Sequence, residues 1–195
     1  MSSNISIVEQ ASNCKTNQNR PDPSEVVLSL LELEKHYKKI NTDCSLADLI
    51  GCWNLRFITG TKKTRKKAGI VMGAGKFIPH WLKIQIIYEN DPQSTTNIGR
   101  VKNSIELGFL KLSLSGPVKF IPTRKILAFD FTSLNLNVLG IKLYSGYIRG
   151  GLETETEFYH QALKEQAFFR YFLLQNNLIA ARGKGGGLAL WSRQE

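Results

Sequence analysis

The chain has 195 residues, of which 42% are apolar, and a formal net charge of +10 at pH 7. This length fits one domain with a tail, and the apolar content excludes a generally disordered protein. No apolar run approaches the roughly 20 residues that a membrane-spanning helix requires, which excludes a helical integral membrane protein.

The cysteines are Cys14, Cys44 and Cys52, and no two of them form a Cys-x-x-Cys motif. Their odd number argues against a disulfide framework, and their spacing, like that of the three scattered histidines, argues against a zinc site. We therefore expect a reducing compartment and no metal or cofactor.

Residues 1–21 are rich in Ser, Asn and Gln with little periodicity, which predicts a flexible N-terminal tail. They lack a basic region followed by an apolar one, and their only basic residues are Lys15 and Arg20. We therefore expect neither a secretion signal nor a transit peptide.

A helix-start signature follows at Asp22-Pro-Ser-Glu25, because Asp22 suits the capping position and Pro23 the first helical position. Apolar spacing predicts a helix from there to about residue 40, and a shorter one begins near Ser45. Residues 22–50 are thus predicted to form an N-terminal helical segment.

From Gly51 the apolar period changes to two, which is typical of strands. Alternating or short apolar runs occupy 53–57, 82–86, 110–114, 127–131, 134–138, 141–148, 168–174, 178–182 and 188–193. About nine or ten short strands separated by turn residues indicate an antiparallel sandwich or a closed barrel. We favour a barrel over residues 51–195, because closure removes apolar edges and leaves room for one apolar ligand.

The glycine-rich stretch Arg182-Gly-Lys-Gly-Gly-Gly-Leu188 lies between the last two predicted strands. A phosphate-binding loop needs Ser or Thr after its lysine and opens a helix, whereas here Gly185 follows Lys184 and a strand comes next. Leu188 stands where a dinucleotide fingerprint requires its third glycine. The stretch therefore predicts a tight hairpin turn.

Two longer stretches resemble a known family. Residues 171–191, which end in Ala-Ala-Arg-Gly-Lys-Gly-Gly-Gly-Leu-Ala-Leu-Trp, resemble the C-terminal signature of the plastid lipid-associated protein (fibrillin) family. Leu49-Ile-Gly-Cys-Trp-Asn-Leu-Arg-Phe57 is similar to that family's Gly-x-Trp-x-Leu opening, again after a helix. The resemblance makes residues 22–195 a single fibrillin-type domain. Many members carry an acidic residue where this chain has Lys184, which indicates a divergent subgroup.

The resemblance implies a lipocalin-like barrel without enzymatic activity. Such proteins bind or organise lipids, prenylquinones or carotenoids at thylakoids or at the lipid globules (plastoglobules) of plastids and cyanobacteria. The expected partners are a hydrophobic small molecule and an anionic membrane surface. Because no transit peptide is visible, the cyanobacterial cytoplasm and thylakoid periphery, or a plastid-encoded origin, fits best.

Aromatic and aliphatic residues on the alternating strands are expected inside the barrel, where they line an apolar cavity or fill a core. The candidates are Trp53, Leu55, Phe57, Phe129 and Phe131. Arg182 and Trp191 are candidates to close the barrel floor by stacking a guanidinium on an indole, and a surface arginine is the alternative.

Positive charge is concentrated after residue 50. Residues 1–50 hold five Lys/Arg and seven Asp/Glu, which leaves 21 and nine, a net of +12, for the rest. Five cations fall within six residues directly after the first strand: Lys62, Lys63, Arg65, Lys66 and Lys67. Since each cation near an anionic surface contributes about 1 kcal/mol, we predict a membrane contact there, with a solvated loop as the alternative.

Two other functions remain open. One is a bilin lyase, an enzyme with a lipocalin-like barrel that acts on phycobiliproteins; it requires an acid or base inside the cavity, and no histidine here pairs with a carboxylate. The other is a nucleic-acid-binding module, which needs outward-facing aromatics between cations, whereas the aromatics here lie on the apolar side. We therefore expect no catalytic residues and consider nucleic acid an unlikely partner.

Overall fold

The computed structural model describes residues 2–13, 20–37, 44–60, 75–91 and 97–194. Its helices are α1 (Ser2–Asn13), α2 (Pro23–Tyr37), the 3-10 helices η2 (Leu46–Leu49) and η3 (Pro122–Arg124), and α4 (Leu152–Phe158). Its strands are β1 (Gly51–Thr59), β2 (Gly75–Phe77), β3 (Leu82–Asn90), β4 (Ile98–Leu107), β5 (Leu110–Ile121), β6 (Ile126–Phe129), β7 (Ser133–Val138), β8 (Ile141–Tyr147), β9 (Ala167–Leu174), β10 (Leu178–Gly183) and β11 (Leu188–Arg193).

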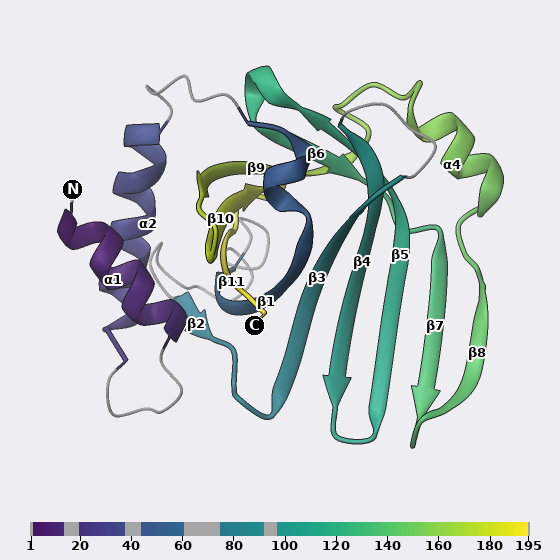
Figure 1. Cartoon of the computed structure of the whole chain (residues 1–195), viewed down its shortest axis with the longest axis horizontal. Helices are drawn as coiled ribbons and strands as arrows, with labels where there is room; N and C mark the ends of the chain where they lie inside the picture. Colours follow the sequence, from purple (N-terminus) through teal and green to yellow (C-terminus); the bar gives the residue numbers. More distant parts are fainter. Residues whose placement is uncertain (1, 14–19, 38–43, 61–74, 92–96, 195) are drawn as a thin grey trace.

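Eight of the described strands close into an antiparallel barrel, in the order β1, β11, β10, β9, β6, β5, β4 and β3 (Figure 1). The prediction of a mainly β, lipocalin-like barrel preceded by a helix is therefore confirmed. Among these eight strands, only β4 was not predicted from the alternating pattern, because Asn103 interrupts its apolar side between Val101 and Ile105.

The barrel is closed over only part of its length, because β5 changes partners at its middle. Residues 118–121 of β5 pair with β6, whereas residues 110–115 pair with β7, which carries β8 on its far side. On the other side, β1 pairs with residues 85–88 of β3 and stops short of residues 82–84. Strands β3, β4, β5, β7 and β8 consequently continue past the closed part as an open sheet (Figure 1).

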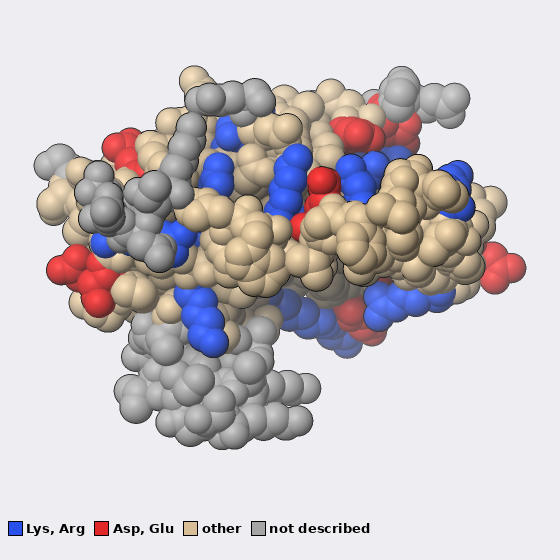
Figure 2. Space-filling model, turned by 90° about the horizontal axis from the view of Figure 1, so that it is seen from below, with Lys and Arg blue, Asp and Glu red and all other residues tan. Residues whose placement is uncertain are grey.

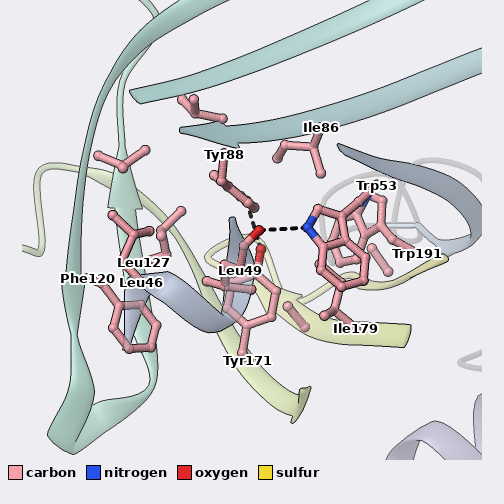
Figure 3. Close-up of a cluster of buried hydrophobic side chains, with 14 residues drawn as sticks. Leu46, Leu49, Trp53, Ile86, Tyr88, Phe120, Leu127, Tyr171, Ile179 and Trp191 are labelled. Carbon is pink, nitrogen blue, oxygen red and sulfur yellow. Dashed lines mark hydrogen bonds between the residues drawn. The ribbon is translucent and has the colours of Figure 1, made fainter. Parts of the chain in front are cut away.

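A packed core fills the closed part of the barrel beneath η2 (Figure 3). Leu46 and Leu49 of η2 are fully buried in it, and the indole of Trp53 donates a hydrogen bond of 2.7 Å to the Leu49 carbonyl. The other buried members are Ile86, Tyr88, Val101, Val118, Phe120, Leu127, Tyr171, Ile179, Ala181, Ala189 and Trp191. This end of the barrel is therefore a filled core.

An N-terminal helix stands where the sequence predicts a flexible tail. Helix α1 packs beside α2 against the outer surface of the barrel, and its Val8 and Ala11 are buried (Figure 1). Its apolar residues Ile5, Ile7, Val8 and Ala11 lie among Ser, Asn, Glu and Gln, so the stripe is too thin to stand out in the sequence. The prediction of a flexible tail is wrong for residues 2–13.

Phe57 belongs to the cluster of apolar side chains that α1 and α2 bury against the outer surface of the barrel. Simple alternation along β1 would place it inside the barrel. A β-bulge between Leu55 and Phe57 shifts the register of β1 against β11 and turns the following side chains over. Phe57 is fully buried against the helical side, and its ring lies 5.0 Å from that of Phe77. The expectation that Phe57 lines the interior is therefore corrected.

Candidate apolar ligand site

The structure brings together most of the residues predicted to line the barrel. Trp53 and Trp191 belong to the packed core, whereas Leu55, Phe129 and Phe131 are partly exposed and pack against its border. Phe129 is the last residue of β6, where the closed barrel gives way to the open sheet. These residues therefore form a floor of buried indoles and a border of partly exposed side chains.

Aromatic rings connect the core to this border. The Phe169 ring lies 5.4 Å from the Trp191 ring and stacks on Phe129 at 5.0 Å. Phe129 in turn lies 5.4 Å from Phe131. Offset and edge contacts at these distances are favourable, so the row is a rigid apolar surface.

Beyond the border, the inner side of the barrel continues onto the open sheet. Register aligns Ile84 with Ile105, Ile105 with Leu112 and Leu112 with Leu136, so these side chains share one side of the sheet. The same side holds twelve apolar residues, which we call the open apolar face: Leu82, Ile84, Ile105, Leu107, Leu110, Leu112, Leu114, Leu134, Leu136, Val138, Ile141 and Tyr144. None of the twelve is buried.

The opposite side of the open sheet is polar. Ser113 pairs with Asn135, which pairs with Ser145, and the Ser145 hydroxyl donates to the Asn135 amide oxygen at 2.7 Å. A sheet with one polar side ordinarily covers its apolar side with other elements. The open apolar face is thus the kind of surface at which another molecule binds.

A single amide stands at the inner end of this face. Asn103 lies on the inner side of β4, in register with Ile86 of the core and with Leu114 of the open face. At the inner positions of β3, β4, β5 and β7, the other polar side chains are Tyr88, whose hydroxyl is engaged by Tyr171, and Asn90, the exposed last residue of β3. The half-buried amide of Asn103 is therefore placed to hydrogen-bond the polar group of an otherwise apolar ligand.

Arg182 does not close the barrel floor. Its Nε donates to a carboxylate oxygen of Glu34 in α2 at 2.8 Å, its Nη2 reaches the other oxygen, and its Nη1 donates to the Gly186 carbonyl at 2.7 Å. It ties α2 to the β10–β11 hairpin on the outer surface, so its assignment to the cavity is wrong. The stack of a guanidinium on an indole is made instead by Arg193, which lies 4.1 Å from the Trp53 ring centroid.

The glycine-rich stretch is a hairpin turn, as predicted. The Gly183 N–H donates to the Gly187 carbonyl at 2.9 Å, and Gly186 adopts a φ of +84°, which favours glycine. Lys184 points back across the turn and donates to the carbonyls of Lys164 and Gln166 at 2.6 and 2.9 Å. A lysine at this position therefore secures the segment that leads into β9.

The buried carboxylate of Glu34 and the partly buried carboxylate of Glu155 are held in ion pairs. Arg100 donates two hydrogen bonds of 2.9 Å to Glu155, and these bonds lower the pKa of its carboxyl. Glu34 is held by Arg182 in the same two-pronged manner. Both carboxylates bind structural partners away from the open apolar face.

Several features bear on what else the chain can bind. In the part of the chain that the structure describes, no three or more His, Cys, Asp or Glu side chains gather where they could hold a metal ion. Among the described helices, none combines the length and apolarity needed to cross a membrane. The basic run Lys62–Lys67 lies outside the described residues, so its predicted membrane contact stays a prediction.

No protein-family model and no curated protein matches this chain. In structure it is similar to a redesigned beta barrel, with 13% sequence identity and a TM-score of 0.37 over 77% of this chain and 96% of that one. None of these comparisons assigns a function to the chain.

Proposed function

We propose that this protein is a non-enzymatic, membrane-peripheral binding protein for a hydrophobic molecule such as a prenylquinone, a carotenoid or a lipid. The observation that supports it is the open apolar face, which continues the barrel interior and holds twelve apolar side chains, four of them exposed and eight half-buried. A ligand is a suitable cover for this face because the opposite side of the same strands is polar.

The dimensions favour an extended ligand. Five strands spaced about 4.8 Å apart make the face roughly 19 Å wide, which suits a long apolar tail. Fully burying an exposed Leu or Ile side chain contributes about 1.5–3 kcal/mol, and covering a half-buried one contributes about half of that, before the costs of binding are subtracted. A tail that covers several of them has enough driving force to bind, and Asn103 gives its polar end a hydrogen-bonding partner.

The resemblance to the fibrillin family supports the same function and suggests the setting. The setting that it suggests is the thylakoid or lipid globule of a cyanobacterium or plastid, where prenylquinones and carotenoids are abundant. The net charge of +10 favours attachment to anionic lipid. The engagement of Glu34 and Glu155 in ion pairs supports a binding protein over an enzyme that needs a free acid or base.

The proposal is tested by titrating the purified protein with a prenylquinone and measuring quenching of tryptophan fluorescence. Leu112→Asn/Leu136→Asn should weaken binding at least about tenfold, because two side chains of the face become polar. The matched control is Leu28→Asn/Leu152→Asn, which makes the same change at two exposed leucines on helices α2 and α4. Equal affinity of wild type and the face variant would refute a ligand site on this face.

The role of Asn103 is tested separately. Asn103→Leu should weaken a quinone, which has carbonyl oxygens, by about tenfold, the value of one good hydrogen bond. It should leave the affinity for a pure hydrocarbon carotenoid unchanged. A uniform loss for both ligands would indicate that Asn103 acts only through the shape of the face.

A further inference from the structure

The β4–β5 turn and the β7–β8 turn lie at the same end of the strands of the open sheet. Leu110 of β5 pairs with Val138 of β7, so the β4–β5 turn and the β7–β8 turn lie side by side. The N–H of Leu139 donates a hydrogen bond of 2.9 Å to the carbonyl of Phe109, which joins the two turns directly. The connection from β2 to β3 reaches the same lower end of the molecule (Figure 1).

Each of the two turns, and the connection from β2 to β3, exposes a large apolar side chain. The exposed fractions are 67% for Trp81, 67% for Phe109 and 74% for Leu139. Trp81 directly precedes Leu82, whose register partner Leu107 leads into the β4–β5 turn. These three residues, which we call the apolar rim, therefore line one end of the open apolar face.

A row of lysines lies just behind this rim, on the polar side of the sheet. Lys83, Lys111 and Lys142 share one register line with Glu106 and Asn137. Glu106 is the only carboxylate in that row, and the Lys111 ammonium lies 3.7 Å from it. Seen from this end, Lys and Arg side chains lie between broad uncharged areas (Figure 2). Lys83 and Lys111 lie two residues from Trp81 and Phe109, and Lys142 lies three residues from Leu139. The row thus keeps a positive charge within roughly 10 Å of the apolar tips along the chain.

We propose that the apolar rim docks on an anionic lipid bilayer, with Trp81, Phe109 and Leu139 entering the interface and the lysine row contacting the headgroups. Apolar tips backed by cations are the arrangement that binds anionic membrane surfaces. The proposal rests on the proposed function, because this orientation brings the open apolar face to the membrane from which an apolar ligand would be exchanged.

Trp81 is a built-in reporter of this contact. The other two tryptophans are buried, Trp53 at 0% and Trp191 at 4% exposure, and belong to the core. Vesicles of phosphatidylglycerol and phosphatidylcholine with brominated acyl chains should therefore quench only the Trp81 emission. Quenching should be absent in Trp81→Phe, which still floats with the vesicles. Wild-type protein that floats without any quenching of Trp81 would overturn the proposed orientation.

Variants of the rim provide the second test. Phe109→Ser/Leu139→Ser should lower the vesicle partition coefficient at least about tenfold, because two apolar tips are removed. Leu28→Ser/Leu152→Ser, at exposed leucines elsewhere, should partition like wild type. Lys83→Gln/Lys111→Gln/Lys142→Gln should weaken binding at low salt and reduce its salt dependence. Unchanged partitioning of both the rim and the lysine variants would overturn the proposal.

The outcomes separate docking from ligand binding and from self-association. The rim variant should still bind a prenylquinone in solution, since Leu112 and Leu136 are intact. If it binds ligand and also floats like wild type, only the docking proposal fails. If the wild type without vesicles sediments as a dimer that Phe109→Ser/Leu139→Ser dissociates, the rim is a contact between two copies and the bilayer proposal is overturned.

Discussion

The phenolic hydroxyls of Tyr88 and Tyr171 lie 2.7 Å apart in the middle of the packed core, and both side chains are buried. They come from opposite walls of the barrel, β3 and β9, so this one hydrogen bond crosses the interior (Figure 3). Each hydroxyl depends on the other, because the surrounding side chains are mainly apolar.

Removing one hydroxyl should therefore cost more than removing both. Tyr171→Phe leaves the Tyr88 hydroxyl buried without this partner and should lower the free energy of unfolding by about 1–3 kcal/mol. Tyr88→Phe/Tyr171→Phe removes both groups and should be closer to wild type than either single variant. Urea unfolding of the four proteins measures this cycle; strictly additive losses would show that the pair is not coupled.

The same pair predicts a loss of stability at alkaline pH. Burial raises the pKa of both Tyr88 and Tyr171 above the usual value of 10.0. Below pH 10 both tyrosines are protonated in the folded and the unfolded chain, so their contribution is fully present. Above pH 10 only the unfolded chain releases their protons, and stability should fall by up to about 1.4 kcal/mol per pH unit for each tyrosine. The slope should be shallower in Tyr88→Phe/Tyr171→Phe, and equal slopes would contradict the assignment.

The ion pair between Arg182 and Glu34 should matter far more than its neighbour on the same helix. The Glu34 side chain is only 7% exposed, so Arg182→Met removes the two-pronged cationic partner of a buried carboxylate and should cost about 2–3 kcal/mol. Glu32 and Lys35 form an exposed pair, so Glu32→Gln should cost about 0.5 kcal/mol or less. Thermal unfolding compares the two variants; a similar small loss in both would show that α2 does not depend on Arg182.

Gly116 should be required where β5 changes partners. A Cβ atom there would lie 2.3 Å from the Asp130 carbonyl oxygen and 3.1 Å from the Thr132 backbone nitrogen. Gly116→Ala should therefore displace the 130–132 connection, cost about 1–3 kcal/mol and increase amide exchange in β7. Gly183→Ala is the matched control, because its Cβ would meet only ordinary contacts of 3.7 Å or more. Unchanged exchange in β7 would contradict this role of Gly116.

The sequence predicts the barrel well because most strands have one apolar and one polar side. It predicts less well wherever a local irregularity changes which side faces inward. The bulge after Leu55 moves Phe57 outward, and no residue in β1 predicts this bulge. Likewise, the partner of Arg182 comes from a helix about 150 residues earlier in the chain, which no local pattern specifies.

The candidate site was visible in the sequence only in part. Leu110, Leu112 and Leu114 alternate clearly, but an alternating strand in a closed barrel and one in an open sheet have the same pattern. What exposes these side chains is the exchange of β6 for β7 beside β5, which depends on pairings between distant segments. The alternating run 127–131 gives no sign that β6 ends at Phe129.

A hydrophobic ligand on the open apolar face should be retained through purification. It can be sought by mass spectrometry of an organic extract of the protein, purified without detergent from a photosynthetic host, beside the Leu112→Asn/Leu136→Asn variant purified in the same way. We expect a stoichiometric prenylquinone, carotenoid or lipid in the wild-type extract and its loss from the variant. A wild-type extract without such a molecule, or equal amounts in both proteins, would contradict this expectation.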